Sequence, residues 1–79
     1  MRYAISICVL KTANNSISHC ALVVDANSQD EATGKGYRVA KKIYPIENYA
    51  QHSVALMMPD LDNCASADPD KDLSNLMKS

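Results

Sequence analysis

The stretch that decides the fold is SQDEATGKGYRVAKKI, residues 28–43. It opens with a capping box, in which the Ser28 hydroxyl can accept from the backbone of residue 31 while the Glu31 side chain reaches back. Pro45 predicts that the helix ends one or two residues before it. Small and apolar residues recur with the period of a helix at Ala32, Gly36, Val39, Ala40 and Ile43.

Strands are predicted on both sides of this helix. Residues 3–10 and 18–26 are rich in β-branched and aliphatic residues, and residues 49–58 alternate in the same way before Pro59. The first of these is the most uniformly apolar and is therefore placed in the centre. We predict an α+β domain, β-β-α-β, with a three-stranded antiparallel sheet in the order 2-1-3 and the helix on one face.

The register of the first two strands depends on the turn between them. Asn tolerates the left-handed backbone angles of a tight hairpin, so a two-residue turn at Asn14 and Asn15 is expected. The residue numbers of each cross-strand pair then sum to 29, so that Ile5 faces Val24. The helix should cover the bulky face that comprises Tyr3, Ile5, Ile7, Val9, Leu22, Val24, Val54 and Leu56.

The residues predicted on the opposite sheet face carry no formal charge. A sheet face that is exposed to solvent normally carries charged or polar side chains. The residues of the predicted face are Ala4, Ser6, Cys8, Leu10, Ala21, Val23, Ser53, Ala55 and Met57. Such a face is expected to be covered by the chain's own C-terminal segment, by a second copy or by a foreign protein. The partner-binding residues predicted on it are Ala4, Cys8, Leu10, Val23, Ala55 and Met57.

Residues 59–79 differ in composition from residues 1–58, which form the predicted domain. They contain five Asp against two Lys and form an acidic tail that is expected to be partly disordered. A short helix over residues 69–77 is possible, because Asp68 can cap it and Pro69 suits its first position. Its apolar face would hold Leu73, Leu76 and Met77.

The charge balance argues against a dedicated nucleic-acid binder. The chain of 79 residues has a net charge of -1, and such binders usually carry a basic excess. One basic stripe lies on the exposed helix face, at Lys35, Arg38 and Lys42. It is either a solvated face or a contact for an acidic partner or a phosphate backbone.

No motif in the sequence indicates chemistry. Gly34 and Gly36 lie inside the predicted helix, whereas a phosphate loop needs its glycines before the helix. His19 and Cys20 point to opposite sheet faces, so they cannot both bind one zinc ion. We therefore expect no catalytic residue, metal, cofactor or small-molecule substrate, and no enzyme.

Cysteine usage and hydropathy indicate a compartment. Three cysteines without a CxxC pair do not form the even framework of small secreted proteins. The apolar stretch after Arg2 alternates and stops at Lys11, unlike a signal peptide, and no run is long enough for a membrane helix. The sequence predicts a soluble protein of the reducing cytoplasm.

Two resemblances add to these predictions. The Ala-x-Ser-x-x-x-Ala entry into the helix (Ala26, Ser28, Ala32), the flanking strands and the acidic tail resemble small phage and prophage proteins. Some of these are anti-CRISPR or other anti-defence inhibitors, and the resemblance implies action by binding. Residues 59–61, Pro-Asp-Leu, with Cys64 are similar to the strand end of HicB-type antitoxins, but Asn63 stands where that motif has Gly.

Together these observations predict a non-catalytic protein-binding module or inhibitor, contacting another protein and/or itself as a homodimer. One alternative is a small regulator that contacts nucleic acid through the basic helix stripe. Another is an antitoxin-like protein.

Overall fold

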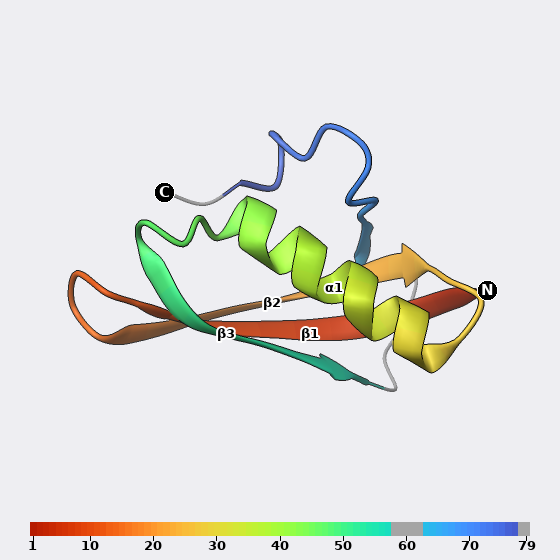
Figure 1. Ribbon diagram of the computed structural model, residues 1–79, viewed down its shortest axis with the longest axis horizontal. Coiled ribbons are helices and arrows are strands. Elements are labelled where there is room, and N and C mark those ends of the chain that lie inside the picture. Colours follow the sequence, from red (N-terminus) through yellow and green to blue (C-terminus); the bar gives the residue numbers. More distant parts are fainter. Residues whose placement is uncertain (58–62, 78–79) are drawn as a thin grey trace.

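The computed structural model describes residues 1–57 and 63–77, and within them one helix covers one face of a four-stranded sheet (Figure 1). The sheet order is β3-β1-β2-β4, in which β1 is antiparallel to both neighbours and β4 runs parallel to β2. The α+β class and the order of the first three strands are confirmed, but the sheet is mixed because of the additional strand. The elements are β1 (Arg2–Lys11), β2 (Ser16–Asp25), α1 (Gln29–Ile43), β3 (Tyr49–Leu56) and β4 (Ala65–Ser66).

Helix α1 begins with the predicted capping box. The Glu31 backbone N–H donates to Ser28 Oγ at 3.1 Å, and the Asn27 N–H donates to Glu31 Oε2 at 2.9 Å. The first bond satisfies a donor that the first turn of a helix leaves without an intrahelical partner, and the second ties the residue before the N-cap to the helix. The buried residues of the helix are those of the predicted stripe, namely Ala32, Gly36, Val39, Ala40 and Ile43.

The predicted hairpin register is wrong by two residues, because Ile5 pairs with Leu22 and not with Val24. The connection is a four-residue loop, 12–15, and not a two-residue turn. Asn14 Oδ1 accepts from the Ser16 N–H at 3.1 Å and from the Ser16 hydroxyl at 2.7 Å, which closes the longer loop. A shift of two leaves every side chain on its predicted face, because the side-chain period of a strand is two.

Strand β3 contains a bulge opposite Val9. The pairing with β1 changes register there, so that Gln51 and His52 together oppose one residue, and Gln51 has a φ of 55°. His52 Nε2 lies 2.7 Å from the carbonyl oxygen of Tyr44 and ties the bulge to the end of α1. Beyond the bulge, β3 keeps its predicted faces; Met58 lies outside the described residues.

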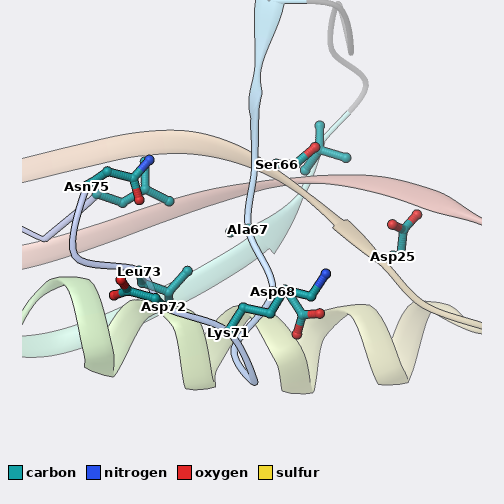
Figure 2. Close-up of a pocket in the computed structure, with 10 residues that line it drawn as sticks. Asp25, Ser66, Ala67, Asp68, Lys71, Asp72, Leu73 and Asn75 are labelled. Atoms are coloured by element: carbon teal, nitrogen blue, oxygen red, sulfur yellow. The ribbon is translucent and has the colours of Figure 1, made fainter.

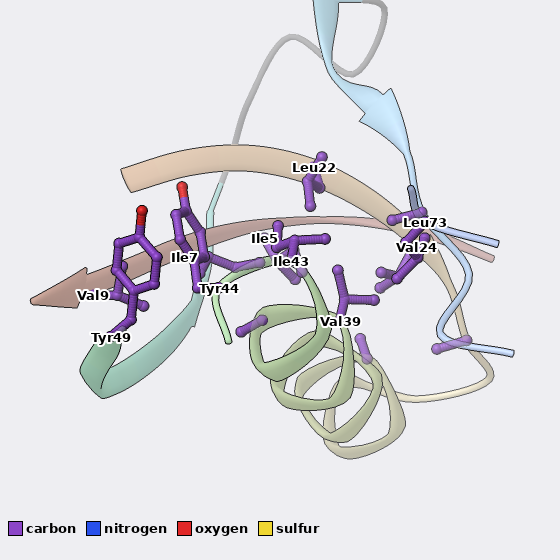
Figure 3. Packing of buried hydrophobic residues seen from close by; sticks show 14 residues of the cluster. Ile5, Ile7, Val9, Leu22, Val24, Val39, Ile43, Tyr44, Tyr49 and Leu73 are labelled. Carbon is purple, nitrogen blue, oxygen red and sulfur yellow. The ribbon is translucent and has the colours of Figure 1, made fainter. Parts of the chain in front are cut away.

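The core lies between α1 and the predicted sheet face (Figure 3). Ile5 and Ile7 are fully buried at its centre, and Leu22 and Val24 complete it from β2. At one end, the Tyr44 and Tyr49 rings meet edge to face, with centroids 5.0 Å apart and planes at 71°. The remaining residues of the predicted face pack as expected, with Val9 buried and Tyr3, Val54 and Leu56 half-buried.

Burial of Tyr44 makes the stability of the fold sensitive to alkali. Removal from water raises the pKa of the Tyr44 phenol, and its hydrogen bond with the Cys20 side chain and the neighbouring Tyr49 raise it further. The neutral phenol is therefore favoured in the folded chain, while the unfolded chain ionises near its ordinary pKa of about 10. The stabilisation is complete below that pH and is lost as pH rises above it.

We expect the free energy of unfolding to fall from about pH 10 upward, by up to about 1.4 kcal/mol per pH unit from this group. Tyr44→Phe should remove that part of the slope, whereas Tyr37→Phe on the exposed helix face should retain it. Urea unfolding of the two variants and the wild type, between neutral and alkaline pH, measures this pH dependence. If the free energy of unfolding fell equally steeply with pH in the wild type and in Tyr44→Phe, the Tyr44 phenol would not be its source.

The described part of the acidic tail packs beside α1 (Figure 1) and contributes Ala67 and Leu73 to the core. The helix predicted over 69–77 is wrong, because these residues form turns. The Asp70 N–H donates to Asp68 Oδ1 and the Ser74 N–H donates to Asp72 Oδ1, both at 2.9 Å. Such local bonds from aspartate compete with helix formation.

Candidate binding surfaces

The sheet face opposite α1 is divided into a covered end and an open end. It is not uncharged throughout as predicted, because the observed register pairs Arg2 with Asp25 on this face, next to Ala4 and Val23. Ala4 and Val23 are only 4% and 1% exposed, although both lie on the side opposite α1. The single chain therefore buries this end itself, and the two residues are not accessible to a partner. The described tail adjoins this end of the face, since Val23 lies opposite Ser66 of β4 and the Ala67 N–H donates to the Val23 carbonyl oxygen at 2.9 Å.

The other predicted residues of this face remain accessible and form a continuous area, here called the open patch. Cys8 and Leu10 are half-buried, Ala55 is exposed, and Met57 is 38% exposed. Strand β2 adds Ile17, which pairs with Leu10 and is 70% exposed. The open patch comprises Cys8, Leu10, Ile17, His19, Ala21, Ser53, Ala55 and Met57.

A hollow of about 250 Å³ lies within the open patch, beside the β3 bulge. A bulge bends its strand and strengthens the local twist, which separates neighbouring side chains at that point. The residues that line the hollow are Cys8, Val9, Leu10, Ile17, Gln51 and Ser53. Its wall is mostly apolar, and none of these side chains carries a charge.

Ile17 is the one prominent residue of the open patch that the sequence analysis missed. The assumed two-residue turn left it in the connection before β2. The four-residue loop instead brings it into the strand. The signal was present, because Ile17 has the same parity as Ala21 and Val23 and thus belongs to their face.

The basic stripe on α1 is engaged within the chain. Lys35 Nζ donates to the Asp25 carbonyl oxygen at 2.6 Å and lies 3.8 Å from Glu31 Oε1. Arg38 forms an ion pair with Asp70, and Lys42 Nζ donates to the carbonyl oxygen of residue 69. The stripe thus holds the acidic tail and the end of β2.

A second hollow of about 320 Å³ lies between β2 and the tail (Figure 2). Its lining includes the carboxylates of Asp25, Asp68 and Asp72 and the ammonium group of Lys71. Ser74 donates to Asp72 from its backbone N–H and its hydroxyl, and these bonds hold the pKa of the Asp72 carboxyl below its usual range. The Asp68 carboxylate likewise accepts from the backbone N–H of residue 70. The carboxylates of Asp68 and Asp72 are therefore both hydrogen-bonded within turns of the tail.

The residues considered for metal binding do not converge. His19 lies opposite Cys8 on the open face, whereas Cys20 lies opposite Ile7 on the core face. Within residues 1–57 and 63–77, no group of three or more His, Cys, Asp or Glu side chains could hold a metal ion. Over the same ranges, α1 is too short and too polar to cross a membrane.

Comparison with known proteins finds no match for this chain among protein-family models, curated proteins or solved structures.

Proposed function

We propose that this protein is a non-catalytic binding protein that acts by contacting another protein through the open patch. The observation that carries the proposal is the open patch itself, which contains no Lys, Arg, Asp or Glu and on which Ile17 is 70% exposed beside an apolar hollow of about 250 Å³. Exposed apolar area of this kind on a small domain is typical of interaction sites. Its chemistry fits an uncharged, largely apolar protein surface that inserts a side chain into the hollow.

Two observations favour a protein over nucleic acid as the partner. The open patch offers no lysine or arginine, and phosphate contacts supply most of the affinity for nucleic acid. Lys35, Arg38 and Lys42 are engaged with Asp25 and with the chain's own tail. The regulator that contacts nucleic acid through the helix therefore has weaker support.

Inhibition by binding, in the manner of small phage and prophage proteins, is the role implied by the resemblance in layout across residues 1–58, with the acidic tail, and it stays a prediction. The antitoxin-like alternative also stays a prediction. It depends on residues 59–61, which lie outside the described ranges.

The test compares two isoleucines that are exposed to a similar degree. Ile17→Lys adds a charge to the open patch, whereas Ile46→Lys makes the same change in the loop after α1, where the side chain is 67% exposed. Both variants should keep wild-type stability. Proteins captured from the native host by the wild type and by Ile46→Lys should be lost with Ile17→Lys, as quantified by mass spectrometry.

Retention of the same captured proteins by Ile17→Lys, and by Ala21→Lys on the same face, would exclude the open patch as the binding surface. Generic double-stranded DNA is the comparison ligand. Binding to it with a steep dependence on salt would favour the nucleic-acid alternative.

A further inference from the structure

The outer edge of β3 is free of any strand among the residues that the structure describes. The Met57 N–H donates to the Ala4 carbonyl oxygen at 3.1 Å, so this residue directs its backbone toward β1. Backbone direction alternates along an antiparallel strand. The N–H and C=O groups of Val54 and Leu56 consequently point away from the sheet and can pair with a further strand.

This edge lacks the usual protection against pairing. Natural edge strands carry charges, prolines or bulges that prevent another strand from adding. Strand β3, YAQHSVAL, has no Lys, Arg, Asp, Glu or Pro. Its bulge lies at Gln51, near one end, and the stretch 53–56 pairs with β1 in unbroken register.

Above the edge, α1 presents an exposed aromatic side chain. A Cβ at Gly36 would lie 2.7 Å from Val54 Cγ1, so this turn of the helix sits over the middle of the edge. Arg38 and Lys42 reach the tail on the β2 side. Tyr37, 38% exposed, belongs to the opposite flank, beside β3.

The same flank carries one charge of each sign. Asp30 precedes Tyr37 by seven residues and Lys41 follows it by four, so all three share one side of the helix. Both charged residues are exposed. A two-fold axis near Tyr37 would set two such flanks antiparallel, with the acidic end of each opposite the basic end of the other.

We propose that a second copy of this chain pairs with β3 in antiparallel fashion about Val54, joining the two sheets into one. Tyr37 packs against its symmetry mate over the joined strands, and Asp30 lies close to Lys41 of the partner subunit. The surface is self-complementary, as a two-fold interface requires. The axis is perpendicular to the sheet, so the two open patches lie side by side on the face away from the helices.

The mass in solution tests this arrangement. Sedimentation equilibrium of the wild type should show the mass rising from one chain to two with concentration. Tyr37→Lys places like charges across the axis and should raise the dissociation constant at least about tenfold. Circular dichroism of this variant should match the wild type, since the side chain lies at the surface.

A charge exchange tests the orientation. Asp30→Lys alone and Lys41→Asp alone should each weaken the dimer, and each change acts twice in a two-fold interface. The double variant Asp30→Lys/Lys41→Asp should return the dissociation constant to within about threefold of the wild type, because the pair is restored with its signs reversed. Lys71→Asp is the matched control, because it makes the same charge reversal as Lys41→Asp at an exposed residue of the tail, away from the Tyr37 flank, and it should leave the dimer unchanged.

A wild type that stays monomeric at every concentration would overturn the proposal. A dimer that survives Tyr37→Lys and both single charge changes would also overturn it. Loss of the dimer with Ile17→Lys alone would assign self-association to the open patch instead. This surface is separate from that of the proposed function: a monomeric Tyr37→Lys variant should still capture the partner protein, so the two proposals fail independently.

Discussion

Replacing Leu73 with alanine should lower the free energy of unfolding by about 2–4 kcal/mol, the usual loss when a buried leucine side chain is truncated. Leu73 is 7% exposed and belongs to the core cluster, although it lies 30 residues beyond α1 along the chain. The tail that carries it is held by the Arg38–Asp70 ion pair and by the bond from Lys42. These polar contacts orient the tail, while the burial of Leu73, together with that of Pro69 and Ala67, supplies the apolar contribution to docking.

Met77→Ala is the matched control, because the Met77 side chain is 54% exposed and its truncation removes little buried area. Its free energy of unfolding should stay within about 0.5 kcal/mol of the wild type. Urea denaturation of the two variants measures the difference. Identical midpoints for Leu73→Ala and Met77→Ala would mean that the tail is not part of the cooperative fold.

Opposite effects are expected from the same substitution at the two glycines of α1. A Cβ at Gly36 would lie 2.7 Å from Val54 Cγ1 and 3.0 Å from Ile5 Cδ1. The valine branch is stiff, so β3 must move away from the helix. Gly36→Ala should lower the free energy of unfolding by about 1–3 kcal/mol, the usual cost of overpacking.

Gly34 has open space around it, with nothing within 4 Å of an added Cβ and no positive φ. Gly34→Ala should raise the free energy of unfolding by about 0.5–1 kcal/mol, because alanine loses less backbone entropy in a helix. The two variants differ only in position, so differences in helix propensity cancel between them. Stabilisation by Gly36→Ala would show that α1 lies farther from β3 than these contacts require.

The part of the candidate site that could be predicted is the division of the sheet into two faces. Alternation along residues 3–10 assigned Cys8 and Leu10 to the uncharged face, and the structure places them there. Alternation could not indicate that Ala4 and Val23 on that face are buried while Ala55 stays exposed. Exposure depends on which other segments of the chain lie over each residue.

Short-range patterns determined α1 and the faces of β1, β2 and β3. The capping bonds of Ser28 and Glu31 join residues three or four apart, and the buried stripe follows the period of the helix. Such interactions depend on neighbours in the sequence, and the sequence contains them in full.

Only the tertiary structure decided the hairpin register and the position of the tail. Registers in which the numbers of paired residues sum to 27 or to 29 place every side chain on the same face, so hydrophobic patterning cannot distinguish them. The observed register comes with the longer loop, which the Asn14 side chain closes. Residues 69–77 had the composition of a helix start, yet turns centred on Asp68 and Asp72 and the burial of Leu73 outweighed that local preference. Arg38 and Asp70 are 32 residues apart, and a contact over that separation has no short-range signal in a single sequence.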